Sequence, residues 1–93
     1  NSYLTEEQRA IAPGLYAVLL DIGSELQDGN RDFGALEKSA IHELAGHGFE
    51  PEYVAIRRAQ NLGEPDRDCD ELVVLAAAAL GRARLIDNVI VTV

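Results

Sequence analysis

Two histidines five residues apart, His42 and His47, are the first side chains in this sequence that could do chemistry together. Zinc-binding helices place their histidines four residues apart, so that both rings reach one metal ion from the same face. A spacing of five turns the second ring about 140° away, at 3.6 residues per turn. Because no third ligand is evident either, we expect solvent-facing histidines and no metal site. A metallohydrolase built on this pair remains a minor alternative.

Three aspartates at alternate positions, Asp66, Asp68 and Asp70, resemble the start of a calcium-binding loop. Such a loop needs glycine at its sixth position and a bidentate glutamate at its twelfth. This sequence has Glu71 and Ala77 there. The pattern therefore predicts a solvated acidic loop.

The other reactive residue types form no recognisable site. Cys69 is the only cysteine, which is typical of a reducing cytoplasm, and its acidic neighbours disfavour a thiolate. Arg57 and Arg58 are adjacent in a predicted strand, so they should point to opposite faces and form no clamp. The sequence has neither a glycine-rich phosphate loop nor a Gly-x-Ser-x-Gly nucleophile motif. We expect no catalytic residue in this chain.

Composition limits the classes of protein that remain. The 93 residues are 47% hydrophobic and 26% charged, which is typical of one folded domain spanning residues 1–93. A net charge of −8 disfavours binding to the phosphate backbone of a nucleic acid. The longest apolar run, residues 72–80, is far shorter than the roughly 20 residues that a membrane-spanning helix needs. We therefore expect neither nucleic acid nor a membrane as partner. The chain lacks methionine and begins at Asn1, so we expect a piece of a longer polypeptide.

The first half of the sequence predicts a helical hairpin. Thr5 and Gln8 form a capping box, and Pro13 should kink or break the helix that follows. Gly29 is a plausible end for that helix. Its apolar stripe consists of Ile11, Leu15, Leu19, Ile22 and Leu26.

A second helix is predicted from Phe33 to His47. Asp32 is its N-cap, and Gly48 is its left-handed C-terminal residue. Phe49 should fold back on this helix at Leu44. Its buried stripe consists of Leu36, Ala40 and Leu44.

The remainder of the sequence favours strands. Residues 53–57 alternate and are rich in strand formers, and residues 83–86 and 89–93 look like strands interrupted by Asp87 and Asn88. Residues 72–80 are ambiguous. Alanine favours a helix there, whereas a strand buried on both faces would be equally apolar.

Five segments of the sequence can be taken together: NSYLTEEQR at 1–9, APGLY at 12–16, GF at 48–49, YVAIR at 53–57 and ARLIDN at 83–88. Together they resemble the C-terminal domain of the pantothenate synthetase (pantoate–β-alanine ligase) family. They occur in the family's order and spacing and cover essentially the whole chain.

The resemblance implies an activity for the complete enzyme. The family joins pantoate to β-alanine through a pantoyl-adenylate, using ATP and magnesium, and is expected to be homodimeric. Its nucleotide chemistry belongs to an N-terminal domain and to a Ser-Ser-Arg-Asn junction, of which this chain keeps Asn1 alone. Asn1 is thus the one implied nucleotide-binding residue. Arg58 departs from the family, which often has an acidic residue there, so no charge pairing is carried over to it.

The resemblance also implies a fold: an α+β domain with a helical hairpin packed on a small three-stranded antiparallel sheet. Residues 72–80 then become the central strand, and Gly81-Arg82 the turn that follows. That strand would be apolar on both faces, and two helices can cover only one. We therefore expect the other side to dock the N-terminal domain or a second copy.

The resulting hypothesis is a domain that closes as a lid over an N-terminal active site in the cytoplasm and excludes water from the adenylate. Its expected partners are that N-terminal domain and, in the full enzyme, pantoate, β-alanine and ATP. No bound cofactor is expected on this chain alone. The alternative is a freestanding acidic protein-interaction module without catalysis.

Overall fold

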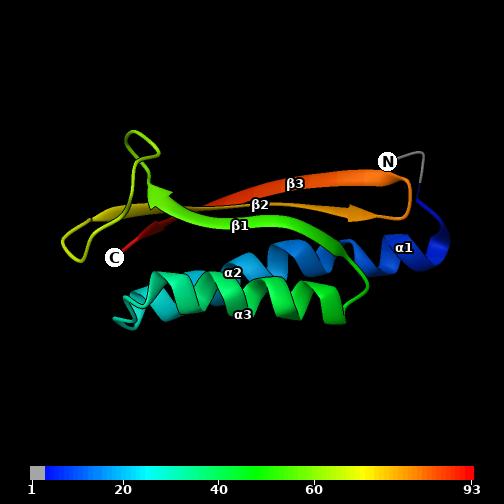
Figure 1. Ribbon diagram of the computed structural model, residues 1–93, viewed down its shortest axis with the longest axis horizontal. Coiled ribbons are helices and arrows are strands. Elements are labelled where there is room, and N and C mark those ends of the chain that lie inside the picture. Colours follow the sequence, from blue (N-terminus) through cyan, green and yellow to red (C-terminus); the bar gives the residue numbers. More distant parts are fainter. Residues whose placement is uncertain (1–3) are drawn as a thin grey trace.

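The computed structural model describes residues 4–93 as two helices packed beneath a sheet, with a short helix at the start (Figure 1). Within this part of the chain, no helix is both long and apolar enough to cross a lipid bilayer. The α+β fold expected from the sequence is confirmed. The elements are α1 (Glu6–Ile11), α2 (Pro13–Gln27), α3 (Phe33–Gly46), β1 (Glu50–Arg58), β2 (Glu71–Leu80) and β3 (Ala83–Thr92).

The helical hairpin begins with the predicted capping box. The Gln8 backbone N–H donates to Thr5 Oγ1 at 3.1 Å, and the Thr5 N–H donates to Gln8 Oε1 at 2.9 Å. Pro13 separates α1 from α2, because it has no N–H to continue the helical ladder. The first helix is therefore broken at the proline.

Helix α3 starts and ends where the sequence predicts, to within one residue. The Asp32 side chain accepts from the Ala35 N–H at 3.3 Å and caps the first turn. Gly48 has a φ of 102°, and the Phe49 N–H donates to the Leu44 carbonyl at 3.1 Å. Phe49 is thereby turned back into the core, where only 3% of it is exposed.

Strand β2 lies at the centre of an antiparallel sheet of order β1-β2-β3. The strand interpretation of residues 72–80 is thus confirmed. The expected interruption at Asp87 and Asn88 is wrong, since β3 is one strand. Both residues stay in the ladder opposite Ala76 and Leu75, so pairing with β2 overrides their low strand propensity.

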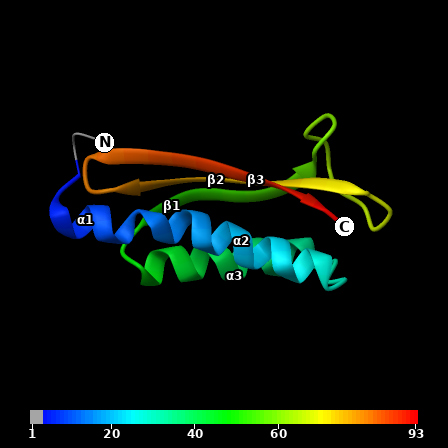
Figure 2. The same cartoon turned by 180° about the vertical axis from the view of Figure 1, so that it is seen from behind.

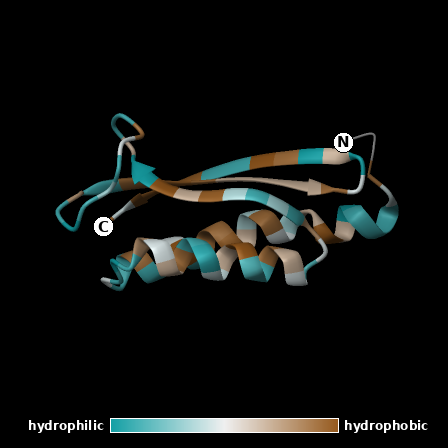
Figure 3. Ribbon diagram, viewed as in Figure 1, coloured by the Kyte–Doolittle hydropathy of each residue, from teal (hydrophilic) through white to brown (hydrophobic). Residues whose placement is uncertain are grey.

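The core lies between the helices and one face of the sheet. Viewed from behind, α2 lies beneath β3, while α3 packs against β1 (Figure 2). Hydrophobic residues alternate with hydrophilic ones along both helices (Figure 3). Of the predicted second-helix stripe, Leu36 is only half-buried. The largest fully buried side chains are Leu19, Leu26, Leu44, Ile56, Leu72, Val18 and Val74.

Gly81, in the turn between β2 and β3, lies against the side chain of Gln8 at the start of the domain. Its φ is 61°, and a Cβ built there would overlap the side-chain amide of Gln8, which the capping box holds in place. We expect Gly81→Ala to lower the free energy of unfolding by about 1–2 kcal/mol, because it adds left-handed strain and disturbs the cap. Urea unfolding followed by circular dichroism measures this loss.

Gly34→Ala is the matched control for this substitution. Gly34 lies in α3 with nothing within 4 Å of a built Cβ, so alanine should leave stability unchanged or raise it by up to about 1 kcal/mol. Equal effects of the two substitutions would contradict the role assigned to Gly81.

Candidate functional site

The two histidines do not form a metal site with each other. His42 is exposed on α3, and His47 is exposed just beyond its end, with Nε2 3.9 Å from the Glu43 carboxylate. Among residues 4–93, no group of three or more His, Cys, Asp or Glu side chains is placed to hold a metal ion. The pair is a surface feature of α3.

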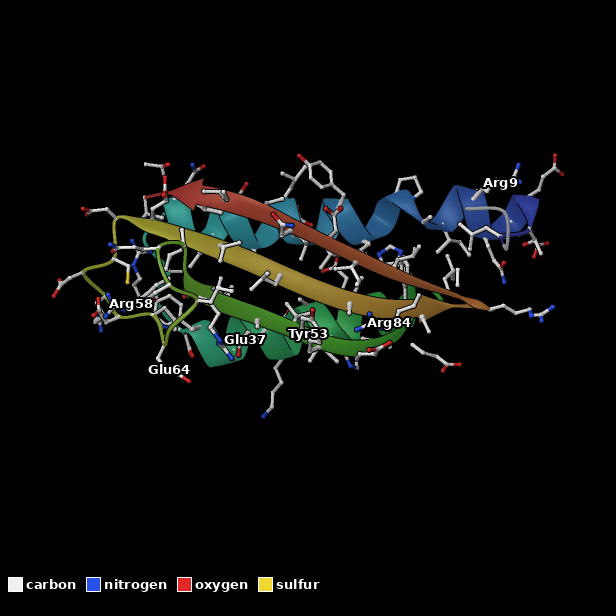
Figure 4. The ribbon with its side chains drawn as sticks, turned by 90° about the horizontal axis from the view of Figure 1, so that it is seen from above. Arg9, Glu37, Tyr53, Arg58, Glu64 and Arg84 are labelled. Atoms are coloured by element: carbon white, nitrogen blue, oxygen red, sulfur yellow. The ribbon has the colours of Figure 1, made fainter. Side chains whose placement is uncertain are left out.

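The acidic loop is organised around Asp66, which uses its carboxylate within the protein. One oxygen accepts from the Asp68 N–H at 2.9 Å, and the other pairs with Arg58. Arg58 also donates through Nε to the Glu64 carbonyl at 2.9 Å (Figure 4). Because these oxygens already have partners, the loop does not fit a calcium ion.

These contacts lower the pKa of Asp66. The hydrogen bond from the Asp68 N–H is the largest cause, followed by that from Cys69 and by the charge of Arg58. Cys69 is half-buried in the same turn, where its sulfur accepts from the Asp66 N–H at 3.4 Å. Cys69 therefore contributes to the hydrogen bonds that hold the acidic loop in place.

Arg57 and Arg58 contact different partners, as the strand geometry predicts. Arg57 Nη1 donates to the Ile56 carbonyl at 2.9 Å and lies 3.8 Å from Glu37, which reaches up from α3. Glu37 also accepts the Ile56 N–H at 2.8 Å. Together Glu37 and Arg57 occupy both backbone groups of Ile56 at the free edge of β1.

The sequence interpretation missed these edge contacts. Glu37 and Ile56 are 19 residues apart, and no local pattern links them. The same holds for Arg84 and Glu52, which pair at 2.9 Å over a separation of 32 residues. Asn1, the implied nucleotide-binding residue, lies outside the described residues.

One face of the sheet is free of helices and forms the top of the molecule (Figure 4). Residues opposite each other in the ladder share a face, so Tyr53, Ala77 and Ile86 lie side by side on this open face. Tyr53 and Ile86 expose 40% and 61% of their surface, whereas Ala77 is fully covered between them. The open face is apolar and carries no cluster of titratable groups at its centre.

Comparison with known proteins adds the decisive observation. Residues 1–90 match the family model described as pantoate-beta-alanine ligase. The chain belongs to the pantoate–β-alanine ligase family. The resemblance to its C-terminal domain, drawn from the sequence segments, is confirmed.

The relatives are pantothenate synthetases. The chain is 50% identical over 90 residues to the enzyme from Halorhodospira halophila, covering 96% of this chain and 32% of that protein. It is 46% identical over 93 residues to that of Azotobacter vinelandii, covering 100% of this chain and 33% of that protein. The crystal structure of pantothenate synthetase from Thermus thermophilus aligns with a TM-score of 0.81 at 28% identity, over 96% of this chain and 32% of that one. The chain thus spans about a third of the length of these relatives.

The carboxyl of Asp66 should titrate below its usual pKa of 3.8. Since the lowered pKa belongs to the folded state, the charged carboxylate stabilises the loop above pH 3.8, and this support is lost as the pH falls through the lower folded pKa. NMR titration of the carboxyl carbon measures the midpoint.

Arg58→Gln should raise that midpoint without restoring 3.8, because the Asp68 and Cys69 hydrogen bonds persist. Arg82→Gln, at an exposed arginine in the β2–β3 turn, is the control and should leave the midpoint of Asp66 unchanged. A midpoint at or above 3.8 in the unmodified protein would show that these contacts do not persist in solution.

Proposed function

We propose that this chain is the C-terminal domain of a two-domain pantothenate synthetase, and that it closes as a lid over an active site carried by the N-terminal domain. The observation that carries this proposal is the match of residues 1–90 to the family model. The chain nevertheless spans only about a third of the length of its relatives. In this assignment the complete enzyme joins pantoate to β-alanine in the cytoplasm.

ATP and magnesium belong to the other part of the polypeptide in this proposal. Across residues 4–93, no cluster of carboxylates is arranged for a cation, and Asp66 is already engaged by Arg58 and its own loop. These residues therefore do not fit a magnesium ion. Asn1, at the expected junction between the domains, is the one position assigned to the nucleotide.

The lid contributes by position and by exclusion of water. An acyl-adenylate is destroyed by water, so a domain that covers it protects the intermediate until the amine attacks. Binding ATP does not require the lid, because the phosphate contacts belong to the N-terminal domain in this assignment. Turnover does require it, because an open or misaligned site can lose on the order of 100-fold in rate.

A domain exchange tests this function. Removing the matching third of the Halorhodospira halophila pantothenate synthetase should leave ATP binding but lower pantothenate formation about 100-fold. Grafting this 93-residue chain in its place should recover the rate to within about tenfold of the parent, since interface differences should cost no more than about 1.4 kcal/mol. Steady-state assays of the three proteins give the comparison.

Two results would contradict the proposal. A truncated relative as active as its parent would remove the need for a lid. A chimera that folds but is no more active than the truncated relative would favour the freestanding interaction module. Circular dichroism of the chimera separates misfolding from a true loss of function.

The chain alone should bind ATP weakly. Its net charge of −8 repels the nucleotide, and its described residues offer no phosphate-binding loop. We expect a dissociation constant weaker than about 100 μM, equivalent to less than roughly 5.5 kcal/mol of binding free energy. Calorimetric titration at low salt measures it, and tighter binding would place part of the nucleotide site in this domain.

A further inference from the structure

Exposed large apolar side chains gather along β3 and the helix beneath it. Tyr16 and Leu20 on α2 expose 48% and 46% of their surface, and Ile86 and Ile90 on β3 expose 61% and 65%. Tyr16 and Ile86 line one surface hollow together, and Leu20 and Ile90 line another. We call these four residues the α2–β3 strip.

The four residues of the strip are grouped on the surface and not scattered over it. Its members are four residues apart on α2 and four apart on β3, so each pair lies along one side of its element. Exposed apolar side chains grouped on neighbouring elements are typical of an interaction site, whereas single exposed apolar residues are ordinary. The strip follows α2 and β3, which pack on each other and lie nearer the viewer than α3 and β1 in Figure 2.

The opposite edge of the sheet is closed to a partner strand at Ile56 and Arg58. Glu37 accepts the Ile56 N–H, and Arg57 donates to the Ile56 carbonyl. The next outward groups, the N–H and carbonyl of Arg58, bond to Gly63 and Leu62 at 3.0 and 2.9 Å. Edge groups that already have partners disfavour strand addition, so docking at the β1 edge is unfavourable.

At the β3 edge, the existing hydrogen bonds favour a partner that makes contact through side chains over one that adds a strand. In the middle of this edge, the Asn88 N–H donates to the Asp87 carboxylate at 2.8 Å, and farther along Gln27 Nε2 donates to the Thr92 carbonyl at 3.2 Å. A partner strand would have to displace these bonds. The exposed side chains of the strip are therefore the groups at β3 that remain for a partner to contact.

A second copy of the chain fits this surface poorly. Antiparallel pairing that set Ile86 against the copy's Ile90 would be centred on Asn88, where the Asp87 carboxylate already holds the N–H. Each copy also carries a net charge of −8, so association brings like charges together.

The N-terminal domain of the same polypeptide fits better. About two thirds of the length of the relatives lies outside this chain. Leu4, the first described residue, lines the same hollow as Tyr16 and Ile86. A domain joined ahead of Leu4 is thereby delivered to one end of the strip, and a short tether supplies an effective concentration of about millimolar.

We propose that the α2–β3 strip is the surface on which the N-terminal domain of the same polypeptide docks. This proposal rests on the proposed function. Arg9 and Asp87 also line the hollow that contains Tyr16, so this hollow combines apolar side chains with one charge of each sign. Charges at an interface fix the orientation of a partner more than they add affinity.

Nitration of tyrosine by tetranitromethane tests the surface with an internal control. Tyr16 lies in the strip and Tyr53 on the β1 side of the open face, and their exposures in this structure are similar, at 48% and 40%. In the full polypeptide, Tyr16 should react about tenfold or more slowly than Tyr53, because docking excludes solvent from the centre of the interface. Mass spectrometry of the two peptides gives both rates.

Substitutions locate the effect. The double substitution Ile86→Asp and Ile90→Asp should restore the reactivity of Tyr16 in the full polypeptide. Leu62→Asp is the matched control, because Leu62 is 57% exposed in the β1–β2 loop, away from the strip, and it should leave Tyr16 protected. Circular dichroism checks that each variant folds.

Four results would overturn the assignment of this surface. Equal reaction rates would show that the strip is not covered, and protection of Tyr53 alone would move docking to the β1 side of the open face. Protection of Tyr16 that disappears on dilution, together with a dimer-to-monomer transition in ultracentrifugation, would assign the strip to a second copy. Full activity of the domain-exchange chimera with a freely reactive Tyr16 would reject the surface while leaving the lid function intact.

Discussion

Strand β2 is hydrogen-bonded along both sides, from Leu72 to Leu80 against β3 and over most of that length against β1. This pairing on both sides places it at the centre of the sheet, and its side chains are apolar on both faces. On the helix side Val74 and Ala76 are fully buried, and the small alanine allows the helices to approach closely. The position of β2 therefore determines which strands form the edges and which face remains for a partner.

The two sides of the domain differ because their edges differ. On the β1 side, Glu37 and Arg57 join α3 to the sheet through the backbone of Ile56, and that side is closed by polar contacts. On the β3 side, apolar groups such as Ile86 and Ile90 remain exposed. A domain that works with a covalently attached neighbour can keep such a surface, because the neighbour covers it.

Local signals predicted the helical half of the fold well. Thr5 and Asp32 cap within their own turns, and Gly48 supplies the left-handed residue after α3, so neighbouring residues suffice to define these positions. Residues 72–80 needed the family resemblance, since an apolar run has no period that separates helix from strand. The prediction of a break at residues 87–88 was wrong, because these residues are held in the strand by pairing with β2, which local sequence does not reveal. The α2–β3 strip was missed because the predicted stripe of α2 described only its buried side.

The uncharged run of β2 also affects how the chain reaches its fold. Residues 72–80 combine high hydrophobicity with no charge and no proline, the composition of segments that self-associate in cross-β aggregates when unfolded. Charged residues flank the run, with Asp70 and Glu71 before it and Arg82 and Arg84 after it. These residues act as gatekeepers, because like charges repel when two such segments stack in register. The central strand that stabilises the native sheet is thus also the segment most in need of protection until β1 and β3 enclose it.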